Sequence, residues 1–230
     1  MISAASIKSR LKNLSIKEKS TMQNELVTYA LERTIYRMSI SKYADNFTLK
    51  GGIFLYALFN RQYPRATMDI DFLANKIAND SHIMKEVFTE IFSIQCDDAL
   101  LFDLSSLKVE NITEFKEYHG VKISIFAFLE KTRIPVSIDI GFGDIVYPDR
   151  VKMDFPVLLD MEIPVVNAYS VYSAIAEKFE AIVSLGRYNS RYKDFYDIYA
   201  ISQKYDIDGL SLSDYSHGQA RGVLTVKFSL

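Results

Sequence analysis

The stretch LKGGIFLYALFNRQYPRATMDIDF, residues Leu49 to Phe72, combines a Gly-Gly step with two aspartates that are separated by one residue. Successive side chains of a strand point to opposite faces, so Asp69 and Asp71 are predicted to share one face, roughly 6–7 Å apart. Such a pair suits Mg²⁺ (or Mn²⁺), because these hard cations take one or two protein carboxylates and fill their remaining positions with water and phosphate oxygens. Alone, the Asp-x-Asp pattern is weak, since solvated strand faces also carry it.

A second part of the same stretch favours phosphate binding. The Gly-Gly step lies between a short predicted strand, Phe47–Lys50, and an apolar helical run, Ile53–Phe59. Gly51 and Gly52 would let the backbone approach a phosphate at the helix N-terminus. The side chains expected to neutralise and orient a triphosphate follow the helix: Arg61, Arg65 and Thr67. Glycines, Arg-x-Thr and Asp-x-Asp in this order favour a phosphate-and-metal site over a solvated strand.

Composition limits the class of protein. The chain has 230 residues, of which 49% are hydrophobic and 24% charged, enough for one large domain or two small ones. A net charge of −2 gives no global signature of a nucleic-acid binder, so an RNA contact would need a local basic patch. The single cysteine, Cys96, excludes an intrachain disulfide and a multi-cysteine zinc site. No secretory or membrane-spanning segment is recognisable, and a cytoplasmic protein is expected.

The N-terminal region predicts a helix. Ser15–Glu18 reads as a capping box, and helical spacing of apolar residues continues to about Ile40. Arg33 and Arg37 lie one helical turn apart, and with Lys42 they would form either a basic ridge or an ordinary solvated face.

The middle of the chain changes from helical to strand periodicity. Asp80 or Ser81 is expected to cap a helix that reaches Phe92. Three extended segments follow, and the first two read as a hairpin with His119 as a surface residue at the turn: Phe102–Ile112, Val121–Phe128 and Ile134–Ile140. A mixed sheet with helices on its faces is predicted, of α/β (α+β) class.

The third extended segment carries one aspartate, Asp139, among apolar neighbours. A carboxylate there is unfavourable unless ionic partners or a metal satisfy it. If this strand lies beside the Asp69 and Asp71 strand, the three carboxylates could hold a second metal about 3.5–4 Å from the first. A purely structural role for Asp139 is the alternative.

A proline-containing connection, Pro148 to Pro164, marks the expected boundary between a domain of residues 1–165 and a helical part of residues 166–230. The first helix of that part, Ser170–Leu185, places Lys178 on the flank of its apolar stripe, and Gly186 is expected to end it before a turn at 187–190.

The second C-terminal helix is predicted over residues 191–204. Asp194 and Asp197 share one of its faces, although Lys193 and Asp197 are also spaced for an ordinary surface pair. Apolar residues recur at Phe195, Ile198 and Tyr199 and need a covering partner.

These residues together resemble the AbiEii-type toxins, nucleotidyltransferases of the polymerase β superfold that act in bacterial toxin–antitoxin and phage-defence systems. The resemblance rests on four ordered motifs between about Glu32 and Tyr205: Leu49-Lys50-Gly51-Gly52, Arg65-Ala66-Thr67-Met68-Asp69-Ile70-Asp71-Phe72, Ile138-Asp139-Ile140-Gly141, and Glu177-Lys178 with Arg191-x-Lys193-Asp194-x-x-Asp197.

The resemblance implies a metal-dependent enzyme that transfers nucleotide from an NTP substrate to an RNA acceptor, with the tRNA 3′ end as the acceptor it suggests, and a cognate antitoxin as partner. Asp69, Asp71 and Asp139 would hold the metals, while Lys178 would bind phosphate and Asp194 would act in catalysis. The nucleotide would be cradled by Gly51, Gly52, Arg65, Thr67 and Lys178. A metal-dependent nuclease also uses carboxylate clusters but has no need of the Gly-Gly loop.

The likeness to the family ends after about Asp214. The final residues, YSHGQARGVLTVKFSL, show no helical period, and we expect them to be altered or truncated relative to the family and irregularly packed. Apolar surface left uncovered would favour self-association. An alternative function is therefore a catalytically impaired module that binds nucleotide and antitoxin.

Overall fold

The computed structural model describes residues 2–63, 65, 67–114, 118–144, 146, 149–185 and 192–207. The chain divides into two compact units, the first comprising residues 1–144 and 152–168 and the second residues 145–151 and 169–230. The described part of the first unit holds a seven-stranded mixed sheet and four of the α-helices, so the predicted α/β (α+β) class is confirmed. The predicted turn at 187–190, Gly186 and the segment after Asp214 lie outside the described residues.

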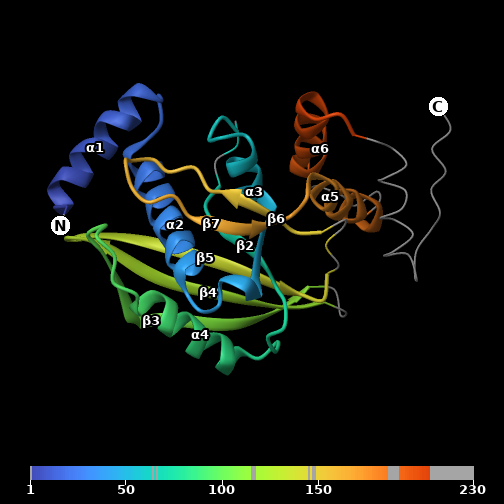
Figure 1. Ribbon diagram of the computed structural model, residues 1–230, viewed down its shortest axis with the longest axis horizontal. Coiled ribbons are helices and arrows are strands. Elements are labelled where there is room, and N and C mark those ends of the chain that lie inside the picture. The colour runs from blue at the N-terminus through green and yellow to red at the C-terminus, as the bar shows by residue number, and fades with distance from the viewer. Residues whose placement is uncertain are drawn as a thin grey trace. The chain divides into compact units, whose positions relative to one another are not determined.

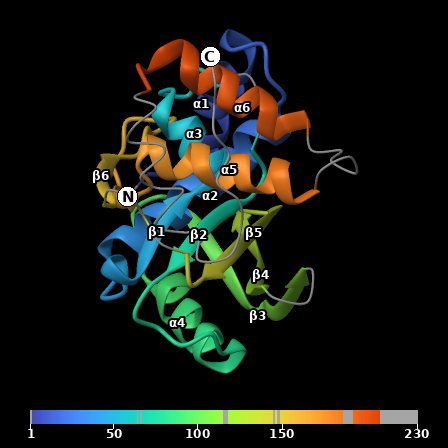
Figure 2. The ribbon, with the colours of Figure 1, turned by 90° about the vertical axis from the view of Figure 1, so that its right-hand side faces the viewer.

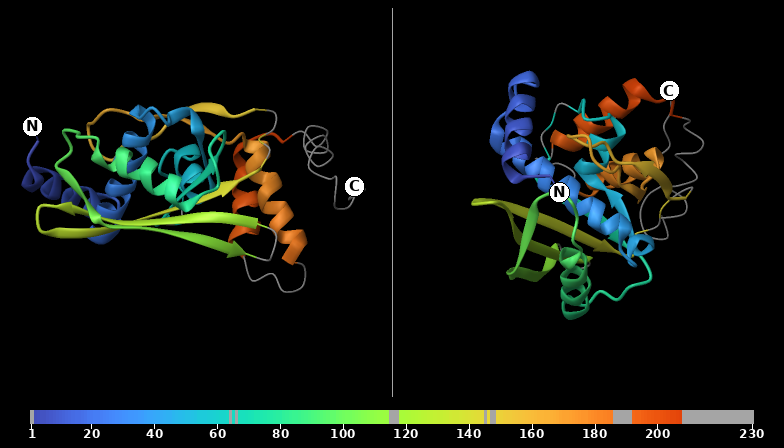
Figure 3. Two further views of the ribbon diagram at one scale, coloured as in Figure 1. Left: turned by 90° about the horizontal axis from the view of Figure 1, so that it is seen from below. Right: turned by 60° about the vertical axis from the view of Figure 1, so that its left-hand side comes forward.

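The sheet has the strand order β3-β4-β5-β2-β1-β7-β6 (Figure 1). Two neighbouring pairs are parallel, β2 with β5 and β1 with β7, whereas β1–β2, β3–β4 and β4–β5 are antiparallel. The strands are β1 (Phe47–Lys50), β2 (Ile70–Ala74), β3 (Leu100–Glu114), β4 (Tyr118–Leu129), β5 (Thr132–Phe142), β6 (Val151–Asp154) and β7 (Val165–Ala168). The predicted hairpin is thus β3–β4, and its long strands continue into β5 (Figure 3).

The N-terminal region forms two helices, not the single helix that the sequence predicts. These are α1 (Ala4–Lys17) and α2 (Met22–Ile40). Ser15, read as a capping residue, lies inside α1, where its hydroxyl donates to the Lys12 carbonyl. The cap of α2 is Thr21, whose hydroxyl accepts from the Asn24 backbone N–H, so the true start lies six residues after Ser15.

Arg33 and Arg37 are buried, so neither the basic ridge nor the solvated face describes them; each is 1% exposed. The Arg37 guanidinium donates to both carboxylate oxygens of Asp98, at 2.5 and 3.0 Å, and Arg33 donates to the Glu162 carbonyl at 3.1 Å. These hydrogen bonds join α2 to the two loops that carry Asp98 and Glu162. Only Lys42 is exposed, in a surface pair with Glu90.

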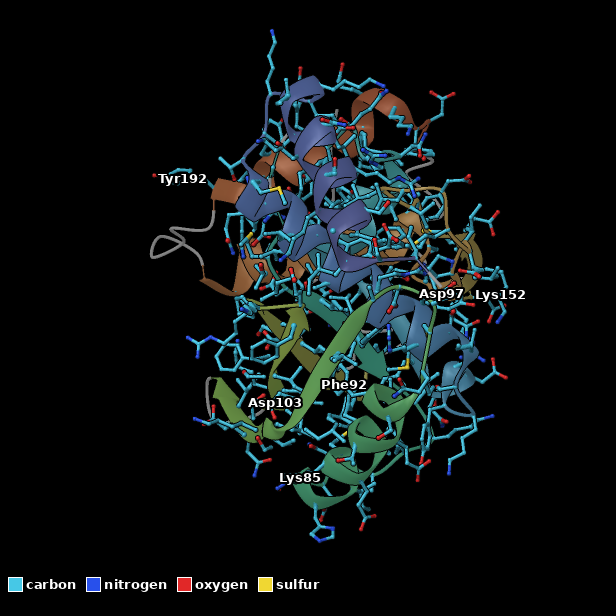
Figure 4. All side chains as sticks on the ribbon, turned by 90° about the vertical axis from the view of Figure 1, so that its left-hand side faces the viewer. Lys85, Phe92, Asp97, Asp103, Lys152 and Tyr192 are labelled. Atoms are coloured by element: carbon cyan, nitrogen blue, oxygen red, sulfur yellow. The ribbon has the colours of Figure 1, made fainter. Side chains whose placement is uncertain are left out.

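Helix α4 (Ser81–Ser93) covers part of one sheet face. Asp80 caps it, as predicted, by accepting from the His82 and Ile83 backbone N–H groups. The Phe92 ring packs on Phe102 of β3 with centroids 4.7 Å apart, while Lys85 points away from the sheet (Figure 4). The helix therefore buries its apolar stripe against the hairpin (Figure 2).

Strand parity separates two kinds of side chain on the central strands. The buried face carries the apolar residues Ile70, Phe72, Val121, Ile123, Ile138 and Ile140. Their neighbours along each strand point to the opposite face, which carries Asp71, Lys122 and Asp139. The apolar core thus fixes the register that brings these charged residues into one row.

The second unit contains α5 (Val171–Leu185) and α6 (Tyr192–Lys204), close to the predicted helical bounds. The Ser170 hydroxyl accepts from the Ser173 backbone N–H at the start of α5. Across the described residues of both units, no helix is long and apolar enough to span a membrane.

Candidate functional site

The corner between β1 and α3 (Gly51–Leu58) begins the site. Gly51 adopts a φ of +66°, a conformation that glycine reaches without steric penalty, and this turns the chain from strand into helix. A side chain at Gly51 would overlap the Asp71 carboxylate, because that carboxylate lies directly against the glycine. The glycine is therefore required both for the turn and for the position of Asp71.

Gly52 brings the first turn of α3 against two predicted phosphate ligands. A Cβ at this position would lie 3.1 Å from Arg65 Nη2 and 3.2 Å from Thr67 Oγ1. Thr67 is 8% exposed, and its hydroxyl has no hydrogen-bond partner among the described residues. A buried hydroxyl of this kind is unfavourable unless it has a partner, and here it lies at a helix N-terminus that attracts anions.

Arg61 takes a different place from the one predicted. Its guanidinium pairs with Glu18 and donates to the Val157 carbonyl at 3.3 Å, so it supports loop packing. Arg61, Arg65 and Thr67 were all expected to contact phosphate. Arg65 and Thr67 are the two that lie beside Gly52.

Strands β2 and β5 are neighbours in the sheet (Figure 2). Asp71 and Asp139 are register partners on these parallel strands, so their side chains lie side by side on one face. Asp69 directly precedes β2 instead of lying within it, and it is half-buried. The strand-parity argument therefore applies to Asp71 and Asp139 but does not fix the direction of Asp69.

Two lysines flank the carboxylate pair, and neither was identified as a site residue from the sequence. Lys50 is the register partner of Asp71 and pairs with Asp144 at 3.0 Å. Lys122 is the register partner of Asp139 and pairs with it at 3.1 Å. Their signal in the sequence was strand parity, since Lys122 alternates with Val121 and Ile123. These residues form the row Lys50-Asp71-Asp139-Lys122 across four strands.

Ser137 lies on the same face as Asp139, two residues earlier on β5. Its hydroxyl is buried and has no hydrogen-bond partner among the described residues. Like Thr67, it is a polar atom that a ligand or water could satisfy.

The described residues contain no group of three acidic, histidine or cysteine side chains arranged to hold a metal ion. The expected cluster of Asp69, Asp71 and Asp139 is therefore not assembled as such a group. Two adjacent carboxylates nevertheless fit the needs of one Mg²⁺, which takes one or two protein carboxylates and leaves its other positions to water and phosphate. The residues present thus fit one cation at Asp71 and Asp139.

In the second unit, Lys178 of α5 joins two aspartates of α6. Its ammonium lies 2.5 Å from Asp197 Oδ2 and 3.5 Å from Asp194 Oδ1. The two carboxylates are 0% and 2% exposed, so the surface pair of Lys193 with Asp197 considered from the sequence is wrong. The sequence did not predict this contact between Lys178 and the two aspartates.

The opposite side of α6 is aromatic and exposed. The exposed fractions are 50% for Phe195, 61% for Tyr199 and 79% for Tyr192. Tyr192 is labelled in Figure 4. The helix thus turns its aspartates inward and its predicted apolar stripe outward. The self-association expected from that stripe stays a prediction.

Two solved structures from Helicobacter pylori resemble this protein in fold. JHP933 from Helicobacter pylori has a similar fold, with a TM-score of 0.53 and 14% identity over 86% of this chain and 75% of that one. A second H. pylori protein, described as a candidate nucleotidyltransferase, has a TM-score of 0.50 and 14% identity over 81% and 72% of the two chains. At this identity the likeness concerns the fold alone. No significant match is found among curated proteins.

Residues 33–217 match the family described as "Nucleotidyl transferase AbiEii toxin, Type IV TA system". The match begins within α2, includes the Gly-Gly corner, the carboxylate strands and both C-terminal helices, and covers most of the chain. The chain therefore belongs to the AbiEii nucleotidyltransferase toxins of type IV toxin–antitoxin systems.

Proposed function

We propose that this protein is a Mg²⁺-dependent nucleotidyltransferase that transfers nucleotide from an NTP to an RNA acceptor, with a tRNA 3′ end as the favoured acceptor. In this role it is the toxin of a toxin–antitoxin pair that serves phage defence. Membership of the family is the basis for proposing nucleotide transfer and an antitoxin partner. The remaining details rest on the residues of the β1–α3 corner and of the neighbouring strands.

The observation that carries the proposal is the buried Thr67 hydroxyl at the N-terminus of α3. It has no hydrogen-bond partner among the described residues, and it lies beside Gly52 and Arg65. Phosphate oxygens of a nucleotide would accept from the hydroxyl, the guanidinium and the backbone N–H groups of the helix. Glycine at position 52 leaves the room that such an approach needs.

The Asp71 and Asp139 carboxylates lie on β2 and β5, the next two strands after β1 in the sheet, and β1 leads into the proposed phosphate site at Gly52, Arg65 and Thr67. Asp71 contacts Gly51, and Asp139 is its register partner on β5. We assign both to the binding of Mg²⁺ (or Mn²⁺), with Asp69 as a further ligand. A bound cation would neutralise triphosphate charge and lower the barrier to displacement. Asp139 would also help to orient and deprotonate the acceptor hydroxyl.

Two residues of the second unit complete the proposal. Lys178 would neutralise charge on the leaving pyrophosphate, and Asp194 would orient or deprotonate the acceptor. Both sit in one buried ionic cluster with Asp197, which holds the lysine at a fixed place on α5. These contacts hold the lysine side chain in one orientation, in which we propose that it meets phosphate.

The test is incubation of the protein with each labelled NTP in turn, Mg²⁺ and total RNA, followed by separation of the RNA. We expect label to enter RNA with one preferred NTP and to disappear in Asp71→Asn. Thr67→Val should weaken binding of a fluorescent NTP analogue while metal binding persists. The matched control is Thr89→Val on α4, a half-buried threonine whose hydroxyl donates to the Lys85 carbonyl of the same helix.

Nucleotide binding without any labelled RNA would favour the catalytically impaired module. Shortening of the RNA without incorporation would favour a nuclease. Transfer that survives Asp71→Asn would overturn the assignment of the carboxylate pair.

A further inference from the structure

The carboxylate pair of β2 and β5 already has a cation beside it. Lys122 Nζ lies 3.1 Å from Asp139 Oδ1, on the side of Asp139 that faces away from Asp71. Asp139 therefore lies between a carboxylate on one neighbouring strand and an ammonium on the other. The positive charge of Lys122 offsets the electrostatic repulsion between the Asp71 and Asp139 carboxylates on adjacent strands.

The exposure of this ion pair makes it displaceable. The side chains of Lys122 and Asp139 are 42% and 32% exposed, whereas Lys178 and Asp197 in the second unit are 11% and 0% exposed. Ion pairs with this much solvent exposure are weak because water screens them, while buried pairs resist separation. A divalent cation offers Asp139 twice the charge of an ammonium.

A released Lys122 also has a second acidic neighbour. Glu110 of β3 is its register partner, so both side chains lie on the same sheet face. Lys50, at the other end of the row, differs because its side chain is only 11% exposed and pairs with Asp144. Lys122 is thus the more exposed of the two flanking cations.

We propose that Lys122 is the resident counterion of Asp139, which a divalent cation must displace before Asp139 becomes a ligand. The inference rests on the proposed function, in which this carboxylate pair binds metal. It makes Lys122 a positioning residue that sets the affinity of the site, with Asp139 available to the metal only after the lysine has left.

The experiment is a titration of the full chain with Mn²⁺, without nucleotide, with free Mn²⁺ followed by electron paramagnetic resonance. Four proteins form a cycle: wild type, Lys122→Gln, Asp139→Asn and the double variant. We expect Lys122→Gln to bind Mn²⁺ about tenfold more tightly, because Asp139 then has no ion pair that the metal must break before it can bind. In the Asp139→Asn background the same substitution should give no gain. Lys152→Gln, which removes an exposed lysine on β6, is the matched control for net charge.

The outcomes separate the two proposals. If wild type binds Mn²⁺ and loses it in Asp71→Asn, but Lys122→Gln binds no more tightly, the counterion role is wrong and the metal site stands. A gain that persists in the Asp139→Asn background, or that Lys152→Gln shares, would also overturn it. If no variant binds Mn²⁺, the metal site itself fails and the inference with it.

Discussion

Two neighbouring glycines should respond in opposite ways to the same substitution. In Gly51→Ala the new methyl group must occupy a φ of +66° and overlap the Asp71 carboxylate. The left-handed conformation alone costs an L-residue about 1–2 kcal/mol. Asp71 must in addition turn away from its place beside Asp139. We expect the free energy of unfolding to fall by about 2 kcal/mol and Mn²⁺ binding to be lost.

Gly52→Ala is the matched variant, because it adds the same methyl group one residue later. Here φ is not positive, and alanine favours the helix by as much as about 1 kcal/mol over glycine. The methyl group would lie 3.1 Å from Arg65 Nη2 and 3.2 Å from Thr67 Oγ1, so these side chains must shift by a few tenths of an ångström. We expect stability within about 1 kcal/mol of wild type, intact Mn²⁺ binding and weakened NTP binding.

Urea unfolding gives the stability of both variants, while Mn²⁺ titration and a fluorescent NTP analogue give the two affinities. The comparison tests whether the corner has two separate tasks, one for Asp71 and one for phosphate. The reasoning is refuted if Gly51→Ala keeps both its stability and its Mn²⁺ affinity. It is refuted equally if Gly52→Ala binds the NTP analogue as wild type does.

Three further predictions concern charge and surface. Burial raises the pKa of Glu32 from 4.5 to about 7, so between these pH values the folded protein binds a proton that the unfolded chain has lost. The free energy of unfolding should therefore fall by about 3 kcal/mol from pH 4.5 to 7. Urea titrations at each pH measure this fall, and Glu32→Gln should abolish it. Lys178→Met removes the ammonium from buried Asp194 and Asp197 and should destabilise the protein by about 3 kcal/mol, so its activity must be judged beside its melting curve; an unchanged melting temperature would contradict this. Tyr199→Ser on exposed α6 should reduce any self-association seen by light scattering, and a monodisperse wild type would show that the aromatic stripe does not drive it.

The sequence predicted the fold wherever one periodicity dominated. Hydrophobic alternation identified β3, β4 and β5 to within a few residues, because one face of each strand is buried. It failed at the start of α2, which Ser15 was expected to cap and which Thr21 caps instead. Local signals rank candidate caps but do not contain the tertiary contacts that select one.

The site was less predictable, because its charges depend on partners that are far apart in sequence. Arg33 and Arg37 have the spacing of a surface ridge, yet they are buried since Asp98 and the 158–162 loop supply acceptors. Asp194 and Asp197 likewise looked like surface acids until α5 brought Lys178 to them. A charged residue can be placed inside or outside only when its partner is known.

For the same reason, the charged row on the sheet could be predicted only from strand parity and strand register together. Parity alone puts Asp71, Asp139 and Lys122 on the polar side of three separate strands, without relating the strands to one another. The register of the paired strands adds that these residues are neighbours in one line, with Lys50 at its end. A line of plus, minus, minus and plus charges is nearly neutral overall, so it can exist in the absence of metal at little electrostatic cost. The row is thus electrostatically balanced as it stands, and under our proposal its affinity for metal depends on how easily Lys122 leaves Asp139.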